Sequence, residues 1–153
     1  MAAEKKNINI SNRRAYFEFE ILEKFTAGIM LTGTEIKSIR ESKANINDGF
    51  CFIIKGEMHI RNMHIAEYSH GNIYNHDPIR QRKLLLTKKE IKRWAGKTKE
   101  KGLTIVPLKV FISERGFAKI ELGLAKGKKT HDKRESLKAK DSKREVDRVL
   151  KRY

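Results

Sequence analysis

The alternation of apolar and polar residues predicts that much of this chain folds as β-strands. Over residues 16–22, Phe17, Phe19 and Ile21 fall on one face and two glutamates on the other. A period of two residues is typical of a strand with one buried face. A second apolar run covers residues 27–31, and we expect a short turn between the two runs.

Two helices are indicated by their N-terminal caps. Thr32 or Thr34 can cap a helix that carries Ile36 and Ile39 toward a core. The sequence from Thr87 to Glu90 matches a capping box, in which the hydroxyl and the carboxylate each bond a free backbone amide. This predicts a helix that begins at residue 88, with Ile91 and Trp94 facing inward and Gly102 as its C-terminal cap.

The remaining strands are expected as hairpins. Pro107 lacks the N–H that a central strand needs, so we place it at an edge or a bulge. Residues 66–83 show neither the two-residue period of a strand nor the spacing of a helix. We expect this loop to be poorly ordered without a partner. The predicted hairpin strands cover residues 50–54 with 58–65, and 103–112 with 117–125.

These roughly six short strands and two helices predict a mainly β fold. We expect a small oligonucleotide-binding-type (OB-like) β-barrel with flanking α-helices, because closing a barrel satisfies the edges of many short strands. Residues 12–125 would form this barrel, residues 1–11 a flexible arm, and residues 126–153 a separate tail.

The tail, residues 126–153, holds twelve Lys or Arg and five Asp or Glu but few apolar residues. Val146, Val149, Leu150 and Tyr153 have helical spacing. Four apolar side chains cannot offset the ordering of the whole segment, at about 1–2 kcal/mol of backbone entropy per residue. We therefore expect a tail that is disordered when free and helical when bound in an anionic groove.

Net charge narrows the choice of partner. The chain carries a formal charge of +16 and has a pI near 10.0, which favours nucleic acid or an anionic membrane surface over mere solubility. The tail lacks a bulky apolar face, so the membrane alternative is weak. No apolar run approaches the ~18 residues of a membrane span, and the sole cysteine, Cys51, lies in an apolar run and is expected to be buried. We expect a cytoplasmic protein.

The sequence gives little support for an enzymatic function. His64, His76 with Asp77, and His131 with Asp132 lack metal-site spacing, and there is no glycine-rich phosphate loop. His64 alternates with apolar neighbours in a predicted strand and is expected to lie at the surface. We expect no catalytic residues, no metal and no cofactor.

Basic residues cluster instead in a way that suits RNA. Lysine and arginine bind phosphates without reading sequence, and no aromatic-rich strand signature is visible, so shape recognition of folded RNA is favoured over single-strand stacking. Each patch alone could be a solvated surface. The clusters are residues 12–14, 37–43, 80–83 and 88–93, together with the tail; the candidate contacts in the body include Arg13, Arg14, Lys37 and Lys83.

Six stretches in a fixed order resemble the SmpB family, the bacterial SsrA-binding proteins, over nearly the full length of the chain. They are residues 27–38 (Ala-Gly-Ile-Met-Leu-Thr-Gly-Thr-Glu-Ile-Lys-Ser), 43–45 (Lys-Ala-Asn), 75–78 (Asn-His-Asp-Pro), 82–86 (Arg-Lys-Leu-Leu-Leu), 123–129 (Gly-Leu-Ala-Lys-Gly-Lys-Lys) and 131–134 (His-Asp-Lys-Arg).

The resemblance implies an adaptor for trans-translation. Such a protein binds the tRNA-like part of transfer-messenger RNA with its barrel and, together with elongation factor Tu, delivers that RNA to stalled ribosomes. Its basic tail enters the empty messenger channel near the decoding centre of the small subunit. The chain would be a monomer. The alternative is a general basic ribosomal or RNA-chaperone protein of similar fold.

The resemblance also implies site residues. Asn12, Leu85 and Lys119 match RNA-contacting positions of the family, whereas Thr26 stands where many members have an RNA-binding glutamate. Thr87 replaces a family asparagine, which its capping role explains. The ribosome-engaging tail would comprise Gly127, Lys128, Lys129, His131, Asp132, Lys133 and Arg134.

Overall fold

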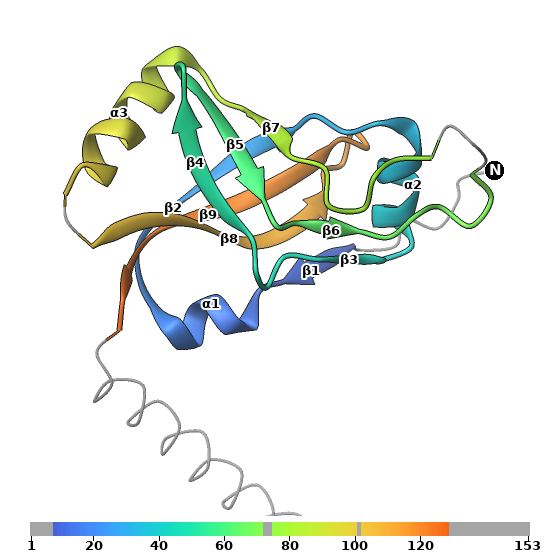
Figure 1. The fold of residues 1–153 in the computed structure, drawn as a ribbon, viewed down its shortest axis with the longest axis horizontal. Coiled ribbons are helices and arrows are strands. Elements are labelled where there is room, and N and C mark those ends of the chain that lie inside the picture. The colour runs from blue at the N-terminus through green and yellow to red at the C-terminus, as the bar shows by residue number, and fades with distance from the viewer. Residues whose placement is uncertain (1–7, 72–74, 101, 129–153) are drawn as a thin grey trace, which may run out of the picture.

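The computed structural model describes residues 8–71, 75–100 and 102–128. These residues form nine strands and three helices (Figure 1). In chain order the elements are β1 (Asn9–Ser11), α1 (Arg13–Glu18), β2 (Phe19–Ile29), α2 (Gly33–Arg40), β3 (Ala44–Asn45), β4 (Phe50–Ile54), β5 (Glu57–Arg61), β6 (His64–Ile65), β7 (Arg82–Leu85), α3 (Lys88–Thr98), β8 (Leu103–Ile112) and β9 (Ala118–Gly127).

Six of the strands close into a ring. The antiparallel sheet runs β1-β8-β4-β5-β7-β2-β9, and β8 also pairs with β9, so that the sheet returns on itself. Between β4 and β8 only Cys51 and Ile105 are paired. The fold is therefore mainly β and OB-like, as predicted, although the ring is not a regular barrel. Closure leaves few free strand edges.

The interior follows the predicted alternation. Apolar side chains on the inward positions of the strands are almost wholly buried, among them Met58, Ile60, Leu84, Ile120 and Leu122. Each such burial contributes about 1.5–3 kcal/mol before chain entropy is counted. One large cluster thus fills the ring, and a smaller second cluster joins Ala15 of α1 to β8 and β9.

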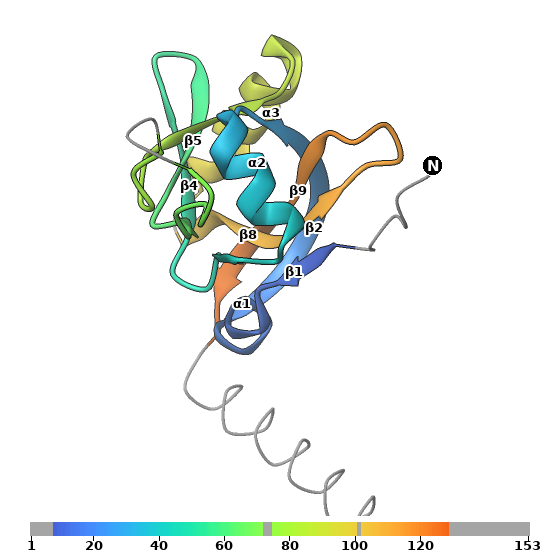
Figure 2. The same cartoon turned by 90° about the vertical axis from the view of Figure 1, so that its right-hand side faces the viewer.

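The two longer helices cover opposite ends of the ring (Figures 1 and 2). Trp94 of α3 stacks on Phe25 of β2, with ring centroids 3.8 Å apart, and Ile39 of α2 is fully buried. The capping box predicted at Thr87 and Glu90 is present, and α3 begins at residue 88 as expected. Thr32 caps α2 with a capping box of its own.

The segment predicted as the first strand is partly helical, which corrects the prediction for residues 16–22. Asn12 caps the short helix α1 through its side-chain oxygen, and Arg14 pairs with Glu18 one turn later. β2 then runs without a turn from Phe19 to Ile29, with a bulge between Ile21 and Glu23. Local capping and packing outweigh the alternation of side chains.

Part of the expected N-terminal arm is a strand. We predicted residues 1–11 to be flexible, but Asn9–Ser11 pair with β8 and Ile8 is buried. The sequence gives no sign that the outer edge of β8 pairs with a further strand. Residues 1–7 lie outside the described residues.

The loop over residues 66–83 is better held than we predicted. Asn75 bonds both backbone groups of Tyr68, and the His76 ring lies 2.9 Å from both the Thr34 hydroxyl and the Ile65 carbonyl. β7 already begins at Arg82. Residues 72–74 lie outside the described part of the loop.

Two further predictions concern Pro107 and Gly102, which were expected to interrupt a strand and to end a helix. Pro107 lies at a register shift of the β8–β9 pairing, which confirms the predicted bulge. The end of α3 differs from the prediction, since Lys99 is its C-cap. Gly102 instead adopts a φ of 87° just before β8, a backbone conformation that favours glycine.

Candidate nucleic-acid interface

Two residues predicted to contact RNA lie on either side of one glycine. Gly28 in β2 pairs with Leu85 of β7 on one side and with Lys119 of β9 on the other. Directly paired residues point to the same face of a sheet. We call the outward face of β7, β2 and β9 the three-strand face. Residues that are 34 to 91 positions apart in the chain therefore meet there across one row.

Gly28 keeps the middle of this row flat. A Cβ atom at this position would lie 3.2 Å from the Leu85 Cβ, closer than ordinary packing allows. Leu85 is 50% exposed, although large apolar side chains are usually covered. The row thus offers an apolar contact beside an open strip of backbone.

Lys119 supplies a cation to the face. It is half-buried and is not ion-paired to any residue that the structure describes. Lys83, on the outward side of β7, bonds Glu57 at 3.1 Å, and this contact lowers the pKa of the Glu57 carboxyl. Lys119 is therefore the better placed of the two lysines for a phosphate.

The position of the absent family glutamate has a carboxylate next to it. Thr26 in β2 pairs with Glu121 in β9, one step along the same face. Glu121 lies 3.8 Å from the Lys24 amine and 3.9 Å from the Lys109 amine. A carboxylate thus lies beside Thr26 on the neighbouring strand.

Asn12 has a structural role that the sequence did not predict. Its side chain is 1% exposed, donates to the Pro107 carbonyl at 2.8 Å and the Ile46 carbonyl at 3.2 Å, and accepts from the Ala15 amide. These bonds use the amide group fully inside the protein. A side-chain contact with RNA would have to break them.

The cations beside Asn12 are exposed. Arg14 bonds Glu18 and, at 2.6 Å, Asp48, and these contacts raise the pKa of its guanidinium. Arg13 has no ion-pair partner among the described residues. On α2, the Lys37 amine lies 5.4 Å from the centre of the Tyr68 ring. Arg13 and Lys37 thus remain available for phosphates, but they lie outside the row of Leu85 and Lys119.

The predicted basic cluster at residues 80–83 is partly internal, which corrects its assignment to the surface. Arg82 is fully buried and bonds the equally buried Glu35 of α2. Its guanidinium also donates to the carbonyls of Met63 and Pro78. Burial lowers the pKa of Arg82, but from a value so high that the group stays charged. Arg82 therefore holds the loop to α2 and cannot contact RNA.

The base of the tail is joined to the ring. Gly127 is the last residue of β9 and pairs with Phe19, and the Lys128 amide and amine donate to the carbonyls of Glu18 and Tyr16. The ring thus extends at least two residues beyond the predicted boundary at residue 125. The other predicted tail contacts, Lys129, His131, Asp132, Lys133 and Arg134, lie outside the described residues.

No metal centre is seen among the described residues. His64 is exposed as predicted, Cys51 is buried with its pKa raised by burial, and no group of three or more metal-binding side chains is present in that part of the chain. Within residues 8–71, 75–100 and 102–128, no helix has both the length and the apolar composition that a bilayer crossing requires.

Comparison with known proteins gives one consistent result. Residues 9–152 match the family model described as SmpB protein. The SsrA-binding protein of Cytophaga hutchinsonii is 56% identical over 144 residues, covering 94% of each chain. That of Ligilactobacillus salivarius is 54% identical over 149 residues, covering 97% of this chain and 96% of the relative.

A solved structure agrees with these relatives. It is described as "tmRNA-SmpB: a journey to the center of the bacterial ribosome", and it superposes with a TM-score of 0.70 at 47% identity over 85% of this chain and 94% of its own. The family match and the identities show that the chain belongs to the SmpB family.

Proposed function

We propose that this protein is a trans-translation adaptor that binds the tRNA-like part of transfer-messenger RNA (SsrA) and delivers it to stalled ribosomes. The observation that carries the proposal is the row of Leu85, Gly28 and Lys119, because it joins three matching family positions in one open surface. The names of the relatives and of the matching structure support the choice of RNA.

The geometry suits shape recognition. Leu85 packs against a sugar or base, Lys119 neutralises a phosphate, and the flat strip at Gly28 lets the RNA backbone approach the sheet. Arg13 and Lys37 add phosphate contacts on adjoining elements, and Arg14 and Lys83 do so when their carboxylate partners release them. Asn12 then acts indirectly, by fixing α1 and the arginines that follow it.

The tail serves a second surface. β9 ends at Gly127, which pairs with Phe19 directly after α1, and the basic residues from Lys129 onward follow it in the sequence. We assign them to the empty messenger channel, where a chain of net positive charge meets ribosomal phosphates. His131, Asp132, Lys133 and Arg134 would engage the decoding centre.

The adaptor acts as a cytoplasmic monomer and catalyses no reaction. Elongation factor Tu accompanies it and the transfer-messenger RNA to the ribosome. No cofactor is needed, because binding two RNA surfaces at once is sufficient for delivery.

A binding titration tests the RNA preference. We would compare transfer-messenger RNA, an ordinary tRNA and an unstructured RNA at about 0.2 M salt, which screens much of the non-specific phosphate attraction. The adaptor should prefer the transfer-messenger RNA clearly. Equal binding to all three that collapses with salt would instead support the general RNA-chaperone alternative, which the exposed lysines Lys88, Lys89 and Lys92 of α3 could serve.

A further inference from the structure

An open hollow of about 200 Å³ lies between α2 and the tip of the β8–β9 hairpin. An engineered apolar cavity of about 150 Å³ in another protein binds benzene. The hollow therefore has room for one aromatic ring. Its lining residues are Ile29, Leu31, Ile36, Gly116, Phe117 and Ala118.

Phe117 stands at the edge of this hollow and is 65% exposed. The backbone of the turn holds it in place, because the Phe117 carbonyl accepts from the Ser113 amide at 2.8 Å and its amide donates to the Ser113 hydroxyl. It lies two residues before Lys119, in the turn just before β9. A large aromatic ring thus stays in water although an apolar hollow adjoins it.

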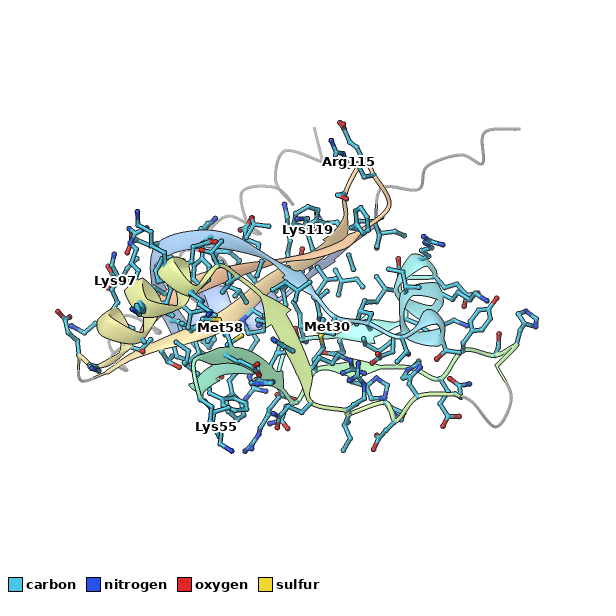
Figure 3. All side chains as sticks on the ribbon, turned by 90° about the horizontal axis from the view of Figure 1, so that it is seen from above. Met30, Lys55, Met58, Lys97, Arg115 and Lys119 are labelled. Carbon is cyan, nitrogen blue, oxygen red and sulfur yellow. The ribbon has the colours of Figure 1, made fainter. Side chains whose placement is uncertain are left out.

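Cationic side chains lie near the hairpin tip that borders the hollow. The Arg40 guanidinium of α2 lies 3.9 Å from the place that a Cβ atom on Gly116 would occupy. Figure 3 shows Arg115 at the tip of the hairpin and Lys119 nearer its base. Neither arginine nor Lys119 is ion-paired to a residue that the structure describes. Positively charged side chains near the hollow can therefore bind anions.

We propose that one unpaired base of the bound RNA enters this hollow and stacks on Phe117, while Arg40 and Arg115 bind the phosphates beside it. An apolar floor beside cationic side chains matches a nucleotide, which joins an aromatic ring to a negative charge. Bases in a duplex do not expose their faces, so the hollow selects a loop or a bulge. The inference rests on the proposed function, and it adds base recognition to the shape recognition of the three-strand face.

The first test is the pair Phe117→Ala and Phe50→Ala. Loss of one stacked base should weaken the binding of transfer-messenger RNA by about 5-fold to 150-fold for Phe117→Ala. Phe50, an exposed aromatic residue of β4 beside Phe52, provides the matched control and should leave binding unchanged. The slope of affinity against salt should stay that of the wild type in Phe117→Ala, because no phosphate contact is lost, whereas Lys119→Ala should lower it by about one.

The second test uses Phe117→Trp as a fluorescent probe, which keeps an aromatic ring in place. Saturating transfer-messenger RNA should quench the added tryptophan, and a perfectly paired RNA duplex should not. The native Trp94 is buried and gives a constant background. Unchanged affinity in Phe117→Ala, or equal quenching by both RNAs, would overturn the inference. If the wild-type protein itself showed no preference for transfer-messenger RNA over tRNA, the proposed function would fail first.

Discussion

The buried ion pair between Arg82 and Glu35 should be a main determinant of stability. We consider Arg82→Met, which keeps much of the side-chain volume but removes the charge. Both partners are 0% exposed, and the guanidinium also donates to the carbonyls of Met63 at 2.8 Å and Arg80 at 2.9 Å. The variant would leave a buried carboxylate and several carbonyls with fewer donors.

The expected loss in the free energy of unfolding depends on the bonds that Glu35 keeps in the variant. Removing one partner of a buried pair typically costs about 3–5 kcal/mol. Glu35 would keep Arg80, at 2.6 Å, and the Thr32 amide, at 2.9 Å, so we expect a loss near the lower limit, about 3 kcal/mol. For a domain of this size this corresponds to a fall in Tm of roughly 10–15 °C.

Urea denaturation followed by circular dichroism measures this loss. Arg80→Met is the control, because the Arg80 side chain is 38% exposed and should contribute about 1 kcal/mol. The double variant Glu35→Gln with Arg82→Met should be less destabilised than the sum of the single variants. A loss below about 1 kcal/mol for Arg82→Met, or strict additivity, would refute the reasoning.

Three further predictions address acid stability, the three-strand face and the tail. The pKa of Glu35 is lowered because its bonds to Arg80, Thr32 and Arg82 outweigh the opposing effect of burial. Its contribution to the free energy of unfolding should therefore be complete above pH about 4.5 and be lost as the pH falls below that value. The variant Glu35→Gln should flatten an acid-unfolding curve in this range. Gly28→Ala should displace Leu85 and weaken transfer-messenger RNA binding in a titration, with Tm changed by only a few degrees. Truncation after Lys128 should leave that affinity near normal and abolish peptide tagging on stalled ribosomes in a translation assay, and loss of both would contradict a separate role for the tail.

Short-range chemistry explains why much of the fold could be predicted. The capping box at Thr87 and Glu90, the bulge at Pro107 and the burial of Ile91 and Trp94 depend on neighbours in the sequence. Such signals need no knowledge of the partner strands. The features that they predict are therefore present in the folded chain.

The errors arise where distant segments decide the outcome. Asn12 caps α1 and bonds the carbonyls of Pro107 and Ile46, so a residue matched to an RNA contact is occupied inside the protein. The sequence places Arg82 in a cluster of basic residues, whereas in the structure Arg82 is paired with the buried Glu35. Neither partner is visible from a local pattern.

The candidate site shows the same division. Leu85 and Lys119 were predicted by resemblance, but their meeting across Gly28 follows only from the pairing of β7, β2 and β9. The sequence predicts a strand that begins at Phe117 and no function for this residue. Its exposure beside an apolar hollow depends on how the hairpin tip lies against α2.

The most direct test of the three-strand face compares two charge reversals, Lys119→Glu and Lys55→Glu. Lys55 is exposed in the β4–β5 turn, and Figure 3 shows it on the opposite side of the ring from Lys119. The two variants change net charge equally, so affinity for transfer-messenger RNA at about 0.2 M salt separates place from total charge. We predict that Lys119→Glu weakens binding at least about tenfold and Lys55→Glu by less than about threefold. Equal losses would show that the chain binds RNA by charge alone, and the account would be wrong.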